Sequence, residues 1–234
     1  MMDEIQRLSV FNAQTENVRE LKRAWVHINR QINGSLLKGD KATTVIQTKV
    51  LAVVYCALAE AIFSKMIHTP HGLTLDEIEQ IKNSKKAGGV KSAWTKCAEL
   101  AICRVDGVSP SHVPNTLRRL SSLIGDYIYD PSLLRNKLAH GQWSVALNQE
   151  NTAVNGEITQ EIKNCTVIDL YRREHALSCL SAIIEDMIES PNRAHRRDFW
   201  VHLTELEEGE RAASQWTLER KIEQLRKKKS FQRP

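Results

Sequence analysis

The segment Pro131-Ser132-Leu133-Leu134-Arg135-Asn136-Lys137-Leu138-Ala139-His140, closed by Gly141, decides how this chain is organised. Asp130 can cap a helix that begins here, because its carboxylate accepts hydrogen bonds from free backbone N–H groups. Pro131 suits the first helical position, where a missing N–H costs nothing, and Gly141 is typical of the residue just past a helix end. We therefore predict a short, well-delimited helix of about three turns.

Three polar side chains of this predicted helix could carry chemistry. Arg135 offers a planar fork of N–H donors that suits phosphoryl oxygens, and His140 offers an imidazole that can transfer a proton near neutral pH. Asn136 lies four residues before His140 and shares its face, where its amide could orient the imidazole or a phosphate. Leu134 and Leu138 share a different face and would anchor the helix to a core.

The string Arg135-Asn136-x-x-Ala139-His140-Gly141 resembles the R-x4-6-H motif of the HEPN superfamily, in the form in which a polar residue follows the arginine. The same spacing recurs from Arg197 to His202, but that match lacks the Asn, the Asp-Pro start and the Ala-His-Gly end, so we favour the first. The resemblance implies an all-α, up-and-down helical bundle.

For activity, the resemblance implies a metal-independent endoribonuclease that needs no cofactor. Arg135 and His140, with Asn136 beside them, would be the catalytic residues, promoting attack of a ribose 2′-hydroxyl on the adjacent phosphate to leave 2′,3′-cyclic phosphate ends. One chain supplies one histidine, so the resemblance also implies a homodimer through the predicted helix, with an acid opposite a base. A toxin–antitoxin or anti-phage role is expected by analogy with the family.

Two other functions stay open. A non-catalytic HEPN-like module would bind RNA, a nucleotide or a partner protein, with Arg135 and His140 holding a phosphate without turnover. A purely structural helical dimer would use the C-terminal helices and ignore the motif. An antitoxin or defence protein is a candidate partner. Toxins silenced by tyrosine modification carry a tyrosine two places after the histidine, whereas Gln142 stands there, so a nucleotidyltransferase antitoxin is not expected.

The composition of the 234 residues is typical of a soluble globular protein, with 41% hydrophobic and 26% charged residues. No run approaches the ~20 apolar residues of a membrane span, and the acidic start Met1-Met2-Asp3-Glu4 is unlike a signal peptide. The five cysteines form no Cys-x-x-Cys pair, and no Gly-rich phosphate loop or Ser-His-Asp arrangement emerges. We expect a cytoplasmic protein without a metal site, whose net charge of +5 permits an anionic partner.

Apolar residues at three- and four-residue spacings predict helices along most of the chain. Asn33-Gly34 is expected to end the first helix, Thr74 and Glu77 form a capping box that starts the third, and Gly88-Gly89 is expected to end that one. Besides the helix that begins at Asp130, the predicted helices are 3–32, 40–68, 74–86, 90–105, 114–129 and 166–190.

Glu60 interrupts the apolar face of the predicted helix 40–68, where a carboxylate is rare unless it is paired. In several HEPN families an acidic residue on this helix is followed a turn later by a basic one, close to the R-x4-6-H helix. Glu60 and Lys65 resemble that pair and would support the site, although Lys65 lies one place further along. The alternative is an exposed Glu60 at the edge of the apolar face.

Cationic residues outside the catalytic set are candidates for RNA contacts. Arg118 and Arg119 lie on the predicted helix 114–129, and Lys137 lies within the motif. A run of lysines further upstream is expected to be a solvated face, with a phosphate track as the alternative; its members are Lys82, Lys85, Lys86, Lys91 and Lys96.

After Gly141 the pattern changes. Residues 143–147 and 156–159 flank a turn-prone stretch and predict a small β-hairpin or an irregular loop. We divide the chain into an HEPN-like bundle, residues 1–190, and a charged C-terminal helical extension, residues 191–234, that ends in a basic tail. A narrow apolar seam in the extension predicts packing on the bundle or on a second copy. The seam is Leu218, Ile222 and Leu225, and the tail is Arg226-Lys227-Lys228-Lys229 with Arg233.

Overall fold

The computed structural model describes residues 2–213 and 215–231, with side chains described up to residue 228. These residues are mostly helical and contain no β-strand, which confirms the all-α class expected from the sequence. The helices are α1 (Glu4–Lys38), α2 (Lys41–Ile67), α3 (Leu75–Ile102), α4 (His112–Ile124), α5 (Asp130–Ala139), α6 (Gly156–Asn164), α7 (Val167–Glu189), α8 (Ala194–Ala213) and α9 (Leu218–Phe231), with a π-helical turn at Gly125–Tyr129.

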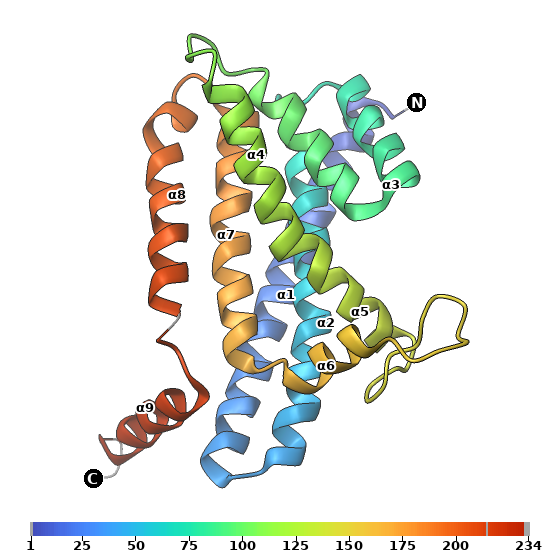
Figure 1. Ribbon diagram of the computed structural model, residues 1–234. Coiled ribbons are helices and arrows are strands. Elements are labelled where there is room, and N and C mark those ends of the chain that lie inside the picture. The colour runs from blue at the N-terminus through green and yellow to red at the C-terminus, as the bar shows by residue number, and fades with distance from the viewer. Residues whose placement is uncertain (1, 214, 232–234) are drawn as a thin grey trace.

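The long helices α2 and α7 pack together at the centre of the bundle, and the other helices surround them (Figure 1). α1 runs along α2 and is joined to it by a tight turn, while α8 runs along α7. α4 and α5 form a nearly continuous rod that crosses this layer, and α6 lies near the end of α5. The arrangement brings α5 against α2.

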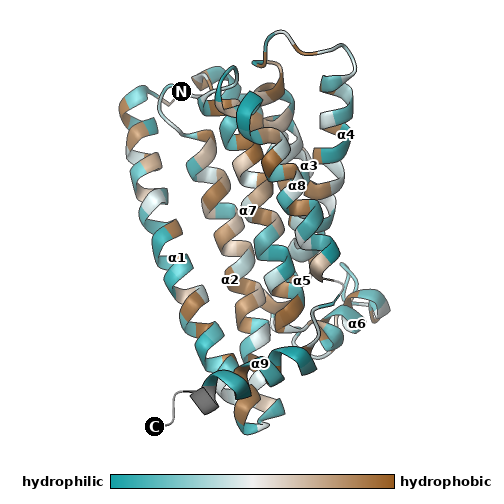
Figure 2. Ribbon diagram, turned by 90° about the vertical axis from the view of Figure 1, so that its left-hand side faces the viewer, coloured by the Kyte–Doolittle hydropathy of each residue, from teal (hydrophilic) through white to brown (hydrophobic). Residues whose placement is uncertain are grey.

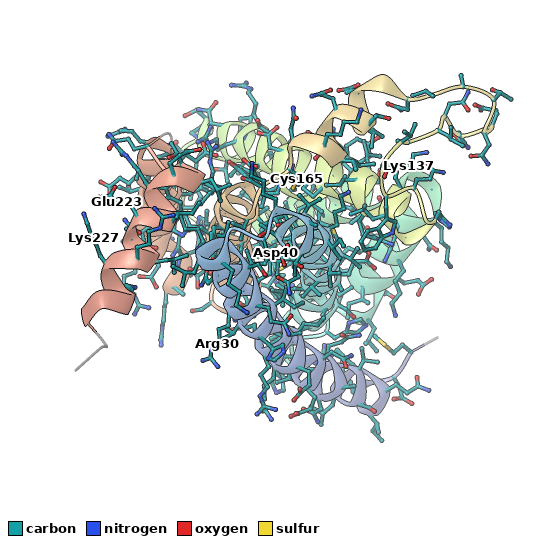
Figure 3. The ribbon with its side chains drawn as sticks, turned by 90° about the horizontal axis from the view of Figure 1, so that it is seen from below. Arg30, Asp40, Lys137, Cys165, Glu223 and Lys227 are labelled. Atoms are coloured by element: carbon teal, nitrogen blue, oxygen red, sulfur yellow. The ribbon has the colours of Figure 1, made fainter. Side chains whose placement is uncertain are left out.

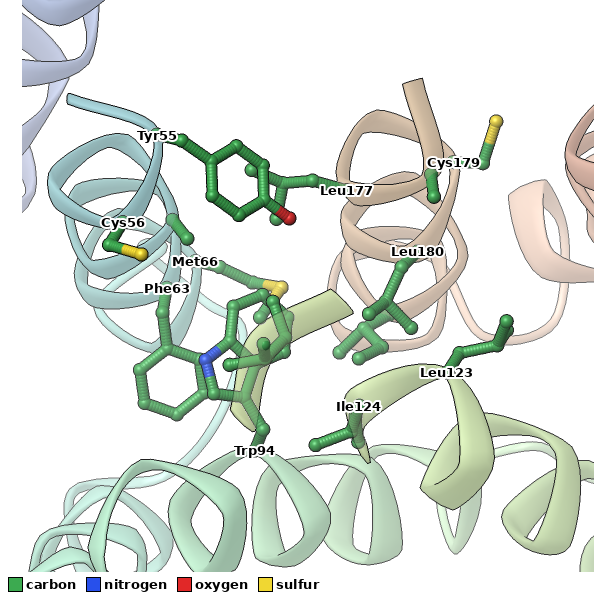
Figure 4. Close-up of a cluster of buried hydrophobic side chains, with 14 of the residues drawn as sticks. Tyr55, Cys56, Phe63, Met66, Trp94, Leu123, Ile124, Leu177, Cys179 and Leu180 are labelled. Atoms are coloured by element: carbon green, nitrogen blue, oxygen red, sulfur yellow. The ribbon is translucent and has the colours of Figure 1, made fainter. Parts of the chain in front are cut away.

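The core lies where α2, α3, α4 and α7 meet, and large apolar side chains fill it (Figure 4). Trp94 of α3 is fully buried and stacks on Phe63 of α2, with 4.7 Å between the ring centroids. Leu177 and Leu180 of α7 belong to the same cluster. Burial of each such side chain contributes ~1.5–3 kcal/mol. Apolar residues accordingly concentrate on α2 and α7, whereas α9 is mostly hydrophilic (Figure 2).

α2 is long and apolar enough to cross a bilayer by length and composition, with a mean hydropathy of 1.9 over its most apolar window. The length and hydropathy of α2 are therefore closer to those of a membrane span than expected from the sequence. The bundle buries 56% of that window, because α1, α5 and α7 pack against the helix. The core helix of a soluble bundle has the same properties, so the structure is compatible with a soluble protein.

The first helix is longer than predicted, because Asn33-Gly34 does not end it. Helical geometry continues to Lys38, since the buried side chains Ile32 and Leu36 offset the ~1 kcal/mol cost of a glycine inside a helix. The helix ends instead at Gly39, whose φ of 73° lies in the left-handed region that favours glycine.

The predicted break at Gly88-Gly89 is present as a kink inside α3. Gly89 has a φ of 73°, and regular helix lies on both sides of the pair. Thr74 and Glu77 form the expected capping box at the start of α3, and Thr166 caps α7 in the same way.

Asp130 does not cap a helix, so that prediction was wrong. It has helical φ and ψ angles, and the chain passes from α4 through the π-helical turn into α5 without a break. Pro131 has no N–H to offer the carbonyl of Tyr127 four residues back, and that carbonyl instead accepts a hydrogen bond from the Tyr55 hydroxyl at 2.6 Å. A tertiary contact thus satisfies the backbone group that a proline inside a helix leaves free.

The segment after α5 is a loop with one antiparallel bridge, between Leu147 and Val154, and no strand pair forms in it. Of the two expected forms, the irregular loop is therefore the one present. Residues 156–159, predicted to flank the turn, are the start of α6, because the Asn155 side chain caps a helix there.

Two helices follow α7, and both pack on the bundle. Buried Phe199 and Leu206 fix α8, which is one uninterrupted helix up to Ala213. The predicted apolar seam of α9 packs against the core, which confirms the first of its two expected partners; the seam is Leu218, Ile222 and Leu225. In the predicted basic tail, Arg233 and the side chain of Lys229 lie outside the described part of the chain.

Candidate functional site

Gly141 ends α5 as the sequence predicts. Its φ of 79° is left-handed, its N–H bonds to the Leu138 carbonyl at 3.1 Å, and the Gln142 N–H bonds to the Lys137 carbonyl at 2.9 Å. This pair of bonds is a Schellman motif, which satisfies carbonyls that the last helical turn leaves free. The helix therefore ends at a fixed point, with His140 exposed at its cap.

Arg135 forms an ion pair with Glu60 of α2, although the two residues are 75 positions apart. Nη2 of Arg135 donates to Oε1 of Glu60, and the two side chains are 32% and 44% exposed. An ion pair this exposed stabilises a fold by only ~0–1 kcal/mol. Its main effect is therefore positional, since it holds a guanidinium at the surface where α5 meets α2.

A groove of about 1030 Å³ opens beside this ion pair, and we call it the α1–α3 groove. Helices α1, α2 and α3 line most of it, and Arg135 belongs to its α5 end. The small side chains of Ala57 and Ala61 on α2 contribute to its surface. Lys82 and Lys85 of α3 also line it, so two members of the predicted lysine run border a concave surface.

Asn136 and His140 are both exposed. Neither side chain makes a hydrogen bond or an ion pair with any residue in the part of the chain that the structure describes. The sequence places the two residues one helical turn apart, but the amide does not hold the imidazole in the single chain. The orienting role considered for Asn136 is therefore absent from this arrangement of residues 2–213 and 215–231.

Lys137 anchors the loop after α5. Its ammonium donates to the Leu147 carbonyl at 2.6 Å, and Lys49 of α2 donates to the Trp143 carbonyl, also at 2.6 Å. The Trp143 indole N–H in turn donates to the Leu138 carbonyl at 2.9 Å. Figure 3 shows Lys137 on the side of this loop, away from α9. Only part of its donor capacity is left for a phosphate.

The structure places three of the predicted site residues elsewhere. Lys65 pairs with Glu185 of α7 at 2.7 Å and does not join Glu60. Arg118 and Arg119 lie on α4, and Arg119 pairs with Glu207 of α8 at 3.4 Å. At ~1.5 Å of rise per residue, Arg119 is roughly 24 Å along the rod from the motif arginine. These cations therefore do not share one site with the motif.

The second match to the motif spacing has acidic surroundings. Arg197 binds both carboxylate oxygens of the neighbouring Asp198, at 2.7 and 2.6 Å. His202 lies between Asp186 and Glu205, with its ring nitrogens 3.4 and 3.6 Å from their carboxylates. Negative charge on both sides of the imidazole opposes a phosphate ligand.

The same acidic surroundings form the group of side chains most suited to a metal ion in the described residues. Ligand atoms of Asp186, Asp198 and His202 lie within 4.8 Å of one another. Each of them already faces an oppositely charged or protonatable neighbour, so the group needs no ion to be stable. No metal or cofactor is assigned to the motif residues.

Two tyrosines near the motif make contacts that the sequence alone does not specify. Tyr55 supports the helix rod through its hydroxyl, for which Pro131 inside a continuous helix is the sequence signal. Tyr129 is 38% exposed, and the Lys91 ammonium lies 5.3 Å from its ring centroid.

No protein-family model, curated protein or solved structure matches this chain.

Proposed function

We propose that this protein is a metal-independent endoribonuclease of the HEPN type, with Arg135 and His140 at its reaction centre. The observation that carries the proposal is the pairing of Arg135 with Glu60 on the long helix α2, at the edge of the α1–α3 groove. An acidic residue on that helix, close to the R-x4-6-H helix, is what the resemblance implies. Sequence spacing alone does not require residues 75 positions apart to meet.

The chemistry follows from the groups at the end of α5. The Arg135 guanidinium uses Nη2 for Glu60, and its Nη1 group has no partner in the described residues, so it is available to a phosphoryl oxygen. The 2′-hydroxyl of RNA attacks the adjacent phosphorus, the bond to the 5′-oxygen breaks, and a 2′,3′-cyclic phosphate forms. One imidazole takes the proton of the 2′-hydroxyl and another gives a proton to the departing 5′-oxygen.

The second imidazole comes from a second copy of the chain. Lys49 of α2 donates to the Trp143 carbonyl, close in sequence to His140, and both α2 near Lys49 and the loop after Trp143 carry exposed apolar side chains. A two-fold interface over this surface would cover them and bring His140 towards the partner subunit's His140. The exposed apolar residues are Val45, Ile46, Val50, Val145 and Val154.

One observation favours the alternative, a non-catalytic module that binds RNA, a nucleotide or a partner protein. The His140 imidazole has no orienting hydrogen bond within the described part of a single chain. Catalytic imidazoles are usually held in one orientation by a second group. A protein in which that group is absent even in the dimer would hold phosphate through Arg135 without cleaving RNA.

By analogy with the family, we propose that the protein is a cytoplasmic toxin or antiviral factor. Its partner would be an antitoxin or another defence protein. The five cysteines are all free thiols, and burial raises the pKa of Cys56 to about 12. Free thiols fit a reducing compartment.

The decisive experiment is RNA cleavage in EDTA by the wild type and by His140→Ala, with the product ends identified. His27→Ala is a matched control, because His27 is an exposed histidine on α1. The proposal predicts cyclic phosphate ends from the wild type and the control, and a cleavage rate about a thousandfold lower for His140→Ala. Equal cleavage by His140→Ala would refute it. RNA binding without cleavage by all three proteins would instead establish the binding module.

Dimerisation is tested on the same preparation by light scattering after size-exclusion chromatography. Ile46→Glu introduces a charge on the exposed apolar surface and should give an inactive monomer. An active monomer would rule out the paired-histidine mechanism.

A further inference from the structure

A second cavity lies far from the motif in sequence, between α7, α8 and α9. Its volume is about 710 Å³, within the range of small-molecule sites. Charged and aromatic side chains converge on it, including Tyr171 from α7, Trp216 from the α8–α9 connection, and Arg220 and Lys221 from α9. The catalytic proposal assigns no role to any of them.

Lys221 is the central group of this cavity. Its ammonium is half-buried, lies 4.3 Å from the centroid of the Tyr171 ring, and donates to the Tyr171 hydroxyl at 2.9 Å. No carboxylate lies within ion-pair distance of it among the described side chains. Partial withdrawal of a cation from water without a carboxylate partner is unfavourable, so an anion bound in the cavity would balance this charge.

The neighbouring donors suit a phosphate. The Tyr171 oxygen accepts from Lys221, and this leaves the phenolic proton to be donated to a ligand. Arg220 uses Nη1 for the Gln215 carbonyl at 3.0 Å, and its guanidinium makes no other hydrogen bond within the described residues. The cavity is lined by one acidic residue, Glu174, and by the two cations of α9, so positive charge is in excess.

An aromatic ring faces the same cavity. Trp216 is 45% exposed and lines the cavity together with Ile168 of α7. An exposed indole is a sequence-tolerant stacking surface for nucleobases and similar rings. The cavity therefore combines a phosphate-sized group of donors with a planar apolar surface.

We propose that the cavity between α7, α8 and α9 binds a small phosphorylated aromatic molecule of the nucleoside monophosphate class. The phosphate lies on Lys221, the Tyr171 hydroxyl and Arg220, and the base stacks on Trp216. The ligand is either a free mononucleotide or the 5′-phosphorylated end of an RNA, which present the same groups. This site does not depend on the ribonuclease proposal.

The test is calorimetric titration of the full chain with AMP, adenosine and inorganic phosphate; the chain carries His140→Ala, the variant for which the catalytic proposal predicts loss of RNA cleavage. Lys221→Met removes the charge and keeps the length of the side chain. Lys228→Met is the matched control, because Lys228 is an exposed lysine on the same helix. Circular dichroism and the thermal midpoint establish that each variant is folded.

The proposal predicts one AMP per chain, at least tenfold weaker AMP binding by Lys221→Met, and a change below twofold for Lys228→Met. Trp216→Ala should weaken AMP binding about tenfold and leave inorganic phosphate binding unchanged. Equal AMP binding by Lys221→Met and its parent, or no AMP binding at millimolar concentration, would overturn it. An RNA oligomer with a 5′-phosphate, compared with its 5′-hydroxyl form, separates the RNA end from the free nucleotide.

The two proposals fail separately. RNA cleavage by Lys221→Met in an otherwise wild-type chain is expected to equal that of the wild type. If Lys221→Met loses AMP binding and still cleaves RNA, the AMP site is separate from the reaction centre.

Discussion

Two segments of this chain have an arginine and a histidine five positions apart, and the fold gives them opposite surroundings. Arg135 pairs with Glu60 on a helix distant in sequence, and His140 is exposed and forms no ion pair in the described residues. Arg197 pairs with the adjacent Asp198, and His202 lies between two carboxylates. The same spacing therefore leaves one pair open to an anion and surrounds the other with negative charge.

The different surroundings of the two segments show that the residues around a motif in space, and not its spacing, determine what it can bind. The first segment lies at the end of a helix, beside a groove, and the second lies inside α8 against α7.

The largest expected effect is on RNA cleavage. His140→Ala should lower the cleavage rate by about a thousandfold, because it removes a proton-transfer group. His202→Ala should change it less than twofold, since its carboxylate neighbours disfavour a phosphate. Initial rates on one RNA substrate measure both. Equal losses in the two variants would remove the contrast between the segments.

The start of α8, two residues before the second segment, should instead matter for stability, as the pH dependence of unfolding can show. His195 of α8 is 2% exposed, and burial, with His112 nearby, lowers its pKa to about 4. The unfolded chain therefore binds more protons between about pH 6.5 and pH 4, and stability is lost as the pH falls through that range. At ~1.4 kcal/mol per pKa unit, the loss is about 2–3 kcal/mol.

Urea unfolding at pH 7 and pH 4.5 measures this loss. His195→Leu should flatten the pH dependence, whereas His27→Ala, at an exposed position, should leave it intact. An unchanged slope in His195→Leu would contradict the assignment.

The helix rod that carries the first segment should depend on Tyr55. Tyr55→Phe leaves the carbonyls of Tyr127 and Arg173 without the hydroxyl that now donates to them, and should cost ~1–3 kcal/mol in the free energy of unfolding. Tyr129→Phe is the control, because the Tyr129 hydroxyl makes no hydrogen bond within the described chain. Chemical denaturation of both variants gives the comparison, and equal effects would count against the role of Tyr55.

The smallest expected effects concern two glycines. An added Cβ meets no atom within 4 Å at Gly141 or at Gly34, so steric contact does not distinguish an alanine at the two positions. Gly141→Ala should destabilise by ~1 kcal/mol, because its φ of 79° strains an alanine. Gly34→Ala should stabilise by ~0.5–1 kcal/mol, since it lies inside α1. Thermal midpoints that shift in the same direction would contradict this.

Local signals in the sequence were sufficient where one residue's chemistry decided the outcome. The capping box at Thr74, the stop at Gly141 and the kink at Gly88-Gly89 depend on nearby backbone geometry, and all are present. Asn33-Gly34 and Asp130 failed for a common reason. Contacts with other helices stabilise a continuous helix at both places, and these contacts are not visible in a local pattern.

The candidate site was predictable only in part, because contacts between helices are not visible in a local sequence pattern. Arg135 and His140 could be identified because they share one helix, and Glu60 because it interrupts an apolar face. Lys65 was placed beside Glu60 by analogy, whereas the fold pairs it with Glu185. Arg118, Arg119 and Lys137 were selected for their charge, but charge alone does not determine the partner of a cation.

The π-helical turn at Gly125–Tyr129 has a consequence for insertions and deletions. Such a turn holds one residue more than the α-helical turn it replaces, and each residue of a helix turns the chain by ~100°. Deleting one residue between 125 and 129 would therefore restore a regular helix and rotate every later side chain of the rod by about that angle. Arg135 would then turn away from Glu60, and Leu134 and Leu138 would leave the core. The rotational register of the helix, and not only its composition, therefore keeps Arg135 at the α1–α3 groove.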